Sequence, residues 1–314
     1  MWPLIKLLPQ RTHYHFVAFA RLAATLSIIA VIATVIGFFY PGLNLGIDFK
    51  GGTVLELNTG AKAVDLGKVR TALTELNIGD VQVQTFGQPN DAIVRFQTPK
   101  GANPAQVVTQ VKTAVSQALG TVTYARTDVV GPEVSSELKF SGAAALLIAI
   151  GLMLLYIWFR FELQFGLGAV VALFHDVTLS FGLILLLRLE FSLNLIAALL
   201  TIIGYSMNDT VVVFDRLREN RRKFKRMPLR ELIDLSVNET LSRTVITGLT
   251  ALLALSGLAI FGGESLRPLS IVLLFGIVIG TYSSIYVASP IILLWGVKAD
   301  DEVAKPIGPQ PARP

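Results

Sequence analysis

One carboxylate, Asp209, lies inside an apolar stretch of the sequence, GYSMNDTVVVFDRLREN at residues 204–220. An Asp at the centre of a membrane helix costs roughly 2.5–3.5 kcal/mol, so such a group usually faces a partner, a cavity or an ion pathway. Thr201, Tyr205 and Asp209 recur every four residues and share one helix face, with Asn208 beside them. The pattern predicts an ionisable site inside the span.

Arg243 begins the next apolar stretch and lies at nearly the same depth as Asp209, because a helix rises about 1.5 Å per residue. Antiparallel neighbouring helices would bring the two groups together, directly or through water. With a movable partner, Asp209 would take up and release a proton. One charge crossing the membrane is worth roughly 2.3 kcal/mol per 100 mV, which shifts a two-state equilibrium about fifty-fold.

Other polar residues in the spans have a structural as well as a functional interpretation. Thr247 and Thr250 continue a polar face beyond Arg243, yet such stripes often only join helices through hydrogen bonds. Arg243 also has a structural interpretation, as an arginine whose long side chain extends to the membrane interface. His175 and Asp176, in the middle of another span, are either a structural pair or a support for the proton site.

The elements that must position these residues are membrane helices. The 314-residue chain is 53% hydrophobic and only 16% charged, with a mean hydropathy of +0.61, whereas soluble proteins carry about 25% charged residues. Apolar runs of about 20 residues are long enough to cross a bilayer. We expect six spans, near residues 19–40, 142–159, 164–187, 192–214, 244–261 and 270–295.

Basic residues set the expected orientation through the positive-inside rule. Eight Lys and Arg residues crowd into the predicted loop 215–241, which we place in the cytoplasm, where it would also contact anionic lipids. Residues 229–241 within it suit a helix lying along the membrane interface. Both termini are then cytoplasmic, as segments 1–18 and 299–314, the latter a disordered tail. Residues 139–298 form the five-helix membrane region.

The outer segment, residues 41–138, has the periodicity of a folded domain. Its order β-α-β-β-α-β is that of a ferredoxin-like α+β sandwich. The expected strands are 53–58, 81–86, 92–98 and 122–130, and the expected helices are 63–76 and 103–119.

Several classes of function are disfavoured. The chain has no cysteine, which excludes disulfides and thiolate chemistry. No nucleophile lies beside a base, and no metal-ligand spacing occurs. The net charge of +5 is concentrated in one loop and does not suggest nucleic acid. We expect neither an enzyme nor a bound metal or cofactor, with H⁺ as the coupling ion and sodium as the alternative.

Three motifs together resemble the SecD/SecF family, in particular its SecF members: GIDFKGGT at 46–53, GYSMNDTVVVFDRLREN at 204–220 and SRTVITGLT at 242–250. The likeness covers about residues 15–298. The resemblance implies a multi-pass subunit of the bacterial cytoplasmic (inner) membrane, within the resistance-nodulation-division superfamily. Asp209 matches the family's proton-linked aspartate, and Arg243 its implicated arginine.

The resemblance also implies partners: SecD, the SecYEG translocon, YajC and YidC, and unfolded preprotein on the outer side. With SecD, such a chain would use the proton gradient to promote preprotein translocation. Gly46, Asp48, Gly51 and Gly52 would connect the first span to the external domain, with Asp48 as a structural turn residue. Two alternatives remain at this point: half of a proton-coupled exporter of small molecules or lipids, or a translocase scaffold that conducts no protons.

Overall fold

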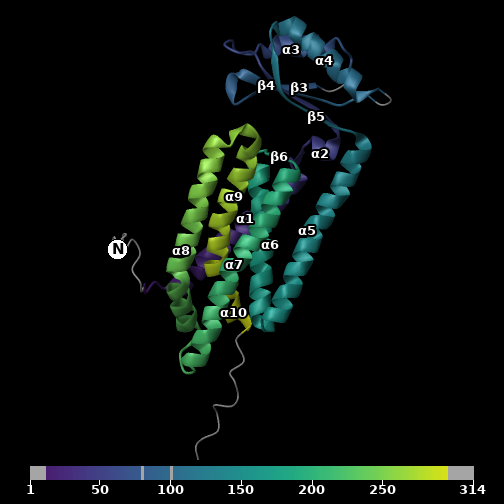
Figure 1. Cartoon of the computed structure of the whole chain (residues 1–314). Coiled ribbons are helices and arrows are strands. Elements are labelled where there is room, and N and C mark those ends of the chain that lie inside the picture. The colour runs from purple at the N-terminus through teal and green to yellow at the C-terminus, as the bar shows by residue number, and fades with distance from the viewer. Residues whose placement is uncertain (1–11, 79–80, 100–101, 296–314) are drawn as a thin grey trace, which may run out of the picture.

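The structure, a computed structural model, describes residues 12–78, 81–99 and 102–295. A long helical bundle carries a small α+β domain at one end (Figure 1). Six of its helices are long and apolar enough to cross a membrane, which confirms the expected number of spans. The predicted tail at 299–314 and most of the predicted N-terminal segment lie outside the described residues.

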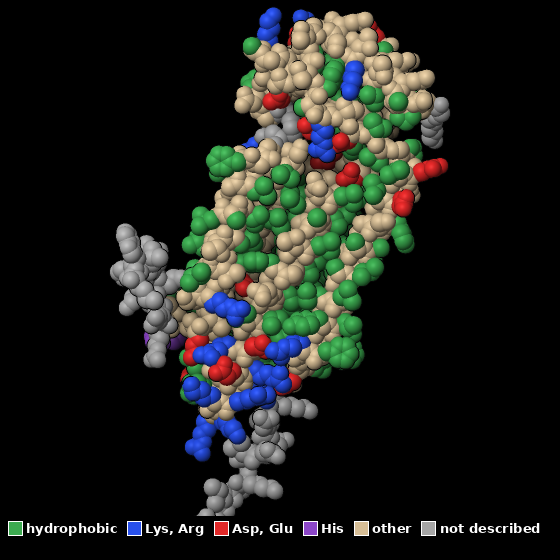
Figure 2. All heavy atoms as spheres, in the orientation of Figure 1, with side chains coloured by type: hydrophobic (Ala, Val, Ile, Leu, Met, Phe, Trp, Pro, Cys, Tyr) green, Lys and Arg blue, Asp and Glu red, His purple; other side chains and the backbone are tan. Residues whose placement is uncertain are grey.

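The six spans differ in how deeply they lie in the bundle. About half of the most apolar part of the third, fourth and sixth spans is buried, against 11–17% for the other three. The outer three therefore present broad hydrophobic faces, and green side chains are spread over the middle of the molecule on the face that Figure 2 shows. The spans are α1 (Ala20–Phe39), α5 (Pro132–Arg160), α6 (Leu163–Leu186), α7 (Leu193–Lys223), α8 (Leu229–Phe261) and α9 (Gly263–Ser283), the last continued by η2 (Ser284–Ala288) and α10 (Ser289–Trp295).

Small residues let α9 approach α7 closely. A Cβ atom on Gly276 would lie 2.3 Å from the side chain of Ile202, and one on Gly280 would lie 3.0 Å from Ser206. Further along, η2 is a π-helical turn directly before Pro290. Because proline has no N–H to donate, a wider turn before it is a common way to continue such a helix. The approach of α9 to α7 brings polar groups of the two helices together.

The predicted cytoplasmic loop 215–241 is mostly helical, which corrects the sequence-based expectation. Helix α7 continues to Lys223 and α8 already begins at Leu229, so only a short turn separates them. Arg216 Nε lies 2.7 Å from Glu239 Oε2, and Asn220 Nδ2 donates to the same carboxylate at 2.6 Å. These cross-helix bonds stabilise both extensions beyond the apolar stretch.

The segment expected to lie along the membrane interface instead forms the first turns of α8. Its apolar side chains, including Leu232, Ile233 and Val237, are buried in the main core together with Phe214 and Leu217 of α7. Packing against α7 thus replaces the expected contact with lipid. Helix α5 likewise begins at Pro132, ten residues before the predicted span, and so rises out of the membrane region toward the external domain.

The external domain has the predicted order of elements, β-α-β-β-α-β. Its strands form one antiparallel sheet in the order β3-β4-β2-β5, and both helices contribute apolar residues to a separate core on one face. The sheet lies between these helices and the bundle (Figure 1). The ferredoxin-like classification stays an interpretation of this topology. The elements are β2 (Gly52–Asn58), α3 (Leu66–Thr74), β3 (Val81–Phe86), β4 (Gln88–Phe96), α4 (Pro104–Leu119) and β5 (Thr123–Val130).

Short elements that the sequence did not predict join the domain to the bundle. Strand β1 (Asn44–Leu45) pairs in parallel with β6 (Glu190–Phe191), which lies between α6 and α7. A single helical turn, α2 (Ile47–Lys50), follows β1 and leads into β2. The chain between α1 and the domain is therefore attached directly to the outer end of α7.

Candidate functional site

Asp209 is buried in α7, with 3% of its surface exposed. Its Oδ2 accepts a hydrogen bond of 3.4 Å from the hydroxyl of Thr281 on α9, at the long limit for such a bond. Thr281 was not predicted from the sequence, although the polar run TYSS at 281–284 in an otherwise apolar span was a usable signal. The carboxylate is thus held within the bundle by one weak contact from a described residue.

Arg243 lies on the exposed side of α8, near enough for its charge to act on Asp209. Among the described residues, however, the two form no direct ion pair or hydrogen bond. The predicted pairing, directly or through water, is therefore not a direct bond in this conformation, and the pairing itself stays a prediction. The other predicted supporting residues of this site divide between the interior and the surface: Tyr205 and Thr247 are half-buried, and Asn208 is exposed.

The hydroxyl of Tyr205 is buried and has no hydrogen-bond partner among the described residues. It faces Gly248 of α8, where an added Cβ would lie 3.6 Å from the hydroxyl and 3.8 Å from that of Thr281. Gly248 therefore leaves room beside two hydroxyl groups near Asp209. Buried polar groups are normally satisfied, so the Tyr205 hydroxyl suits a second conformation that supplies a partner.

His175 and Asp176 form a second polar cluster on α6. Both are buried, and His175 Nδ1 lies 2.8 Å from Asp176 Oδ1. Asp176 Oδ2 also accepts hydrogen bonds from Ser206 of α7 and from Ser283 of α9. Ser206 is one helical turn from Asp209, so α7 and α9 contact both carboxylates. The two clusters expected from the sequence are therefore neighbours.

The outer end of α7 is held by the glycine motif. Asp48 Oδ2 accepts a 2.9 Å hydrogen bond from the backbone N–H of Leu193, the first residue of α7. The N–H groups in the first turn of a helix have no partner within it, and an acidic side chain there also complements the helix dipole. Asp48 thus caps the helix that carries Asp209, and the structural role expected for it stays a prediction.

The glycines of this motif permit close approach and unusual backbone geometry. Gly52 has φ 129°, and a Cβ atom there would lie 2.7 Å from the carbonyl oxygen of Phe96. Gly51 has φ 72°, in the region that favours glycine. At Gly46 an added Cβ would lie 3.0 Å from the carboxylate of Glu190. Side chains at these positions would disturb the connection between domain and bundle.

Charged side chains line a cavity of about 760 Å³ between the sheet and the outer end of the bundle. Arg95 of β4 forms an ion pair there with Glu190 of β6, and Arg126 of β5 donates a 3.1 Å hydrogen bond to Ser265 of α9. Burial raises the pKa of Glu56, and nearby Arg126 partly offsets this effect. The domain is therefore joined to the bundle by polar contacts.

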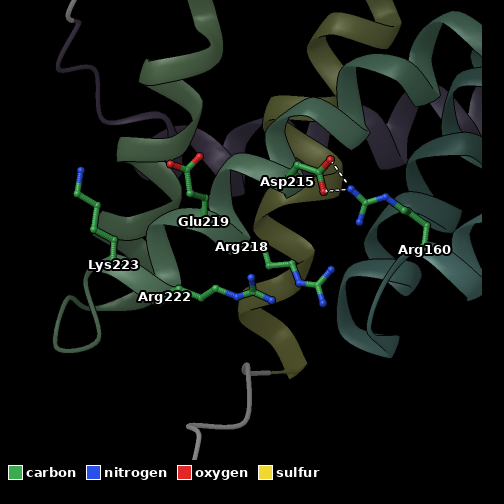
Figure 3. A pocket seen from close by; sticks show the side chains of 6 residues that line it. All are labelled: Arg160, Asp215, Arg218, Glu219, Arg222 and Lys223. Carbon is green, nitrogen blue, oxygen red and sulfur yellow. Dashed lines mark hydrogen bonds and ion pairs between the residues drawn. The ribbon is translucent and has the colours of Figure 1, made fainter.

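The opposite end of the bundle carries a cluster of basic residues on the α7 extension. Arg160 at the end of α5 and Asp215 point toward each other, with Nη2 2.6 Å from Oδ1 (Figure 3). Glu162, between α5 and α6, forms further ion pairs with Arg218 and Arg221. These contacts fix α5 and α6 against α7 where the chain leaves the apolar band.

Within the described residues, no three His, Asp or Glu side chains cluster as metal ligands would. The ionisable groups in the spans are instead arranged in hydrogen-bonded pairs and networks. Together the fold and these groups define a polytopic membrane protein with one folded domain outside the bundle and buried carboxylates within it. The comparisons with known proteins narrow this class.

The chain belongs to the SecD/SecF family. Residues 110–298 match the family described as protein export membrane protein SecD/SecF, C-terminal, and residues 36–63 match the SecD/SecF GG motif. Protein translocase subunit SecF of Rhodobacter capsulatus is 44% identical, over 96% of this chain and 95% of its own length. SecF of Rickettsia bellii is 42% identical, over 95% of this chain and 98% of its own.

Solved structures of SecDF are similar to the whole arrangement. SecDF of Thermus thermophilus, described as a translocon-associated membrane protein, matches with a TM-score of 0.82 at 34% identity. The match covers 94% of this chain and 39% of that one. SecDF in a super-membrane-facing form matches at 33% identity over 94% of this chain and 40% of its own, with a TM-score of 0.65. At the same coverage of this chain and nearly the same identity, the arrangement of this chain is more similar to the first of these SecDF structures.

Proposed function

We propose that this chain is a SecF-like subunit of a bacterial Sec protein-export machinery and that, with SecD, it uses the proton gradient to promote preprotein translocation. The observation that carries the proposal is the burial of the Asp209 carboxylate inside the helical bundle. A carboxylate buried among the spans, weakly bonded to Thr281 and close to Arg243, which forms no ion pair with it among the described residues, suits the binding and release of a proton. Proton transfer drives a conformational change here, without covalent catalysis, cofactor or metal.

A movement at Asp209 would reach the external domain through α7 and the bonds at its outer end. In its charged form the carboxylate attracts Arg243 of α8, and in its neutral form this attraction is lost. Either change moves α8 relative to α7. The outer end of α7 is bonded to Asp48, and β6 before it is bonded to the domain through Glu190 and Arg95. Motion of α7 in the membrane therefore acts on the domain through these bonds.

The exposed face of α7 supports contact with the membrane helices of a second protein. Asn194, Thr201, Gly204 and Asn208 are all exposed along one stripe of this central span. Polar and small residues gain nothing from lipid but suit close contact with another helix. The SecDF chain matched above is more than twice as long as this one. SecD is the partner that we assign to this face.

The location and the remaining partners follow from charge and from the family. The basic α7 extension and α10 lie at the same end of the bundle (Figure 1), and the backbone N–H of Tyr14 bonds to Asn238 in the first turns of α8. We assign this end to the cytoplasm and to contact with anionic lipids. The external domain then lies on the far side of the inner membrane, where it would meet unfolded preprotein. SecYEG, YajC and YidC are the further partners that we propose.

The test is translocation in inverted membrane vesicles containing Asp209→Asn together with SecD. We expect normal assembly with SecD but loss of the part of translocation that depends on the proton gradient. Asp215→Asn is a matched control, because Asp215 lies on the same helix but pairs with Arg160 at the bundle end. It should keep the gradient-dependent part. If Asp209→Asn keeps it too, the proton role fails at this residue and Asp209 is a structural polar contact, as it would be in a translocase scaffold. Replacing the proton gradient by a sodium gradient tests which ion is coupled.

A further inference from the structure

A chain of hydrogen bonds crosses the centre of the bundle and joins α1, α6 and α9. It starts at Asp176 and His175, whose Nε2 lies 3.0 Å from the hydroxyl of Ser27 on α1. That hydroxyl lies 2.9 Å from the hydroxyl of Tyr282 on α9. The Tyr282 hydroxyl in turn donates to the backbone carbonyl of Ala23 at 2.9 Å. The series of hydrogen bonds therefore ends on α1, the helix that also carries Ser27.

The carboxylate of Asp176 is fully buried, and no described Lys or Arg forms an ion pair or hydrogen bond with it. The groups that face the pair from neighbouring helices are hydroxyls, from Ser27, Ser206 and Ser283. The nearest other titratable groups are Tyr282, Tyr286, whose ring lies 5.4 Å from that of Tyr282, and Asp209 one turn beyond Ser206. A negative charge here therefore has no cation to balance it except His175 itself, and an unbalanced buried charge is costly.

The hydrogen-bond chain has four links, and each needs one proton. The links are Asp176 to Nδ1, Nε2 to Ser27, Ser27 to Tyr282, and Tyr282 to the Ala23 carbonyl. The two hydroxyls supply one proton each. A neutral imidazole beside an ionised carboxylate adds only one more, which leaves a link empty. One additional proton on the His175–Asp176 pair fills every link and also makes the pair neutral overall.

We propose that His175 and Asp176 form a second proton-binding site, separate from Asp209, which holds one exchangeable proton in this conformation. The additional proton resides either on the imidazole, as an imidazolium–carboxylate pair, or on the carboxyl, with a neutral imidazole protonated at Nε2. In both forms Nε2 donates to Ser27. Release of the proton leaves one negative charge in the bundle and empties a link between α1 and its neighbours.

The site is placed to act together with Asp209. Ser206 and Asp209 are one turn apart on α7, and Thr281 and Ser283 are two residues apart on α9, so the same two helices contact both carboxylates. The second site adds α1, which leads directly into the external domain. Proton release at His175–Asp176 would therefore loosen α1 from the bundle core, whereas Asp209 acts between α7, α8 and α9.

Nitrogen NMR of the full chain in lipid bilayers tests the proposal, because the sequence contains only three histidines. His13 and His15 are exposed, and a His13→Gln, His15→Gln background leaves the His175 signals alone. With ¹⁵N-labelled histidine, we expect His175 Nε2 to be protonated at neutral pH. As the pH rises, Nε2 should lose its proton while Nδ1 holds the proton shared with Asp176.

Asp176→Asn is the matched variant. Its amide nitrogen donates to Nδ1 as a protonated carboxyl would, so Nε2 should stay protonated at every pH in this variant. The proposal is overturned if Nε2 of the unmodified pair is bare at neutral pH, or if it stays protonated throughout the range in which the protein remains folded. Because the readout is a protonation state, it stands apart from the translocation assay of Asp209.

Discussion

At the scale of single residues, Asp48 links the glycine motif to the helix that carries Asp209. Its carboxylate caps α7 from outside the helix, through the N–H of Leu193. We expect Asp48→Ala to cost about 0.5–2 kcal/mol, the usual effect of losing a cap, and to speed hydrogen exchange in the first turn of α7. Asp65→Ala is the control, because Asp65 caps α3 within the external domain and should affect only that helix. Unchanged exchange at Leu193 would show that the cap does not hold α7.

Glu56 lies in the external domain, and its carboxyl should make the stability of this domain depend on pH. Burial raises the pKa of its carboxyl above the ordinary value of 4.5, with Arg126 opposing the shift. A carboxyl with a raised pKa in the folded state stabilises the domain in its protonated form. That contribution is complete below the ordinary pKa and is lost as the pH rises through the folded-state value.

Glu56→Gln should therefore make the external domain more stable than the unmodified protein at neutral pH, with the difference shrinking in acid. Hydrogen exchange of β2 amides at two pH values measures this effect. A variant that is less stable at neutral pH would mean that the ion pair with Arg126, at 3.8 Å, outweighs burial.

The sequence located the ionisable residues of the site but not all of their contacts. Asp209, Arg243, His175 and Asp176 stand out because charged residues in apolar spans are rare. Thr281, Ser27 and Ser283 do not, because hydroxyl side chains are common in membrane helices and often bond only to their own backbone. Which hydroxyl faces a carboxylate depends on helix rotation and depth, which one sequence does not determine.

At the scale of helices, the approach of α9 to α7 depends on Gly276. Its hydrogen atom faces Ile202 where an added methyl group would overlap. We expect Gly276→Ala to lower the free energy of unfolding of the purified protein by about 1–3 kcal/mol, as overpacking does. Ile202→Ala in the same chain should partly restore it. Gly257→Ala on α8 is the control, since nothing lies within 4 Å of its added methyl group; equal losses in both variants would contradict the proposed contact.

The spans themselves were predictable because an apolar run of about 20 residues matches the thickness of a bilayer. The ends of α7 and α8 were not predictable. Polar and charged residues such as Asn220 and Arg216 indicated a loop in the sequence. In the structure they bond across the hairpin to Glu239, so the helices continue. This pairing joins residues from two helices, and local sequence patterns do not report it.

At the scale of the whole molecule, the ion pair of Arg95 with Glu190 joins the external domain to the bundle. Arg95→Glu places two carboxylates together and should widen the distribution of distances between domain and bundle. Adding Glu190→Arg should narrow it again. The chain has no cysteine, so pairs of introduced cysteines carry spin labels without background for this measurement. A distribution that the single substitution leaves unchanged would mean that β1 and β6 alone hold the domain.

We propose that Asp209 acts through its proton, and the most direct measurement compares Asp209→Glu with Asp209→Asn in vesicles under an imposed proton gradient. Glu retains a titratable carboxyl on a longer side chain, whereas Asn has a similar shape but no proton to exchange. We expect the Glu variant to keep part of the gradient-dependent translocation and the Asn variant to keep none, while both assemble equally with SecD. Full gradient dependence in the Asn variant would contradict a role of the Asp209 proton.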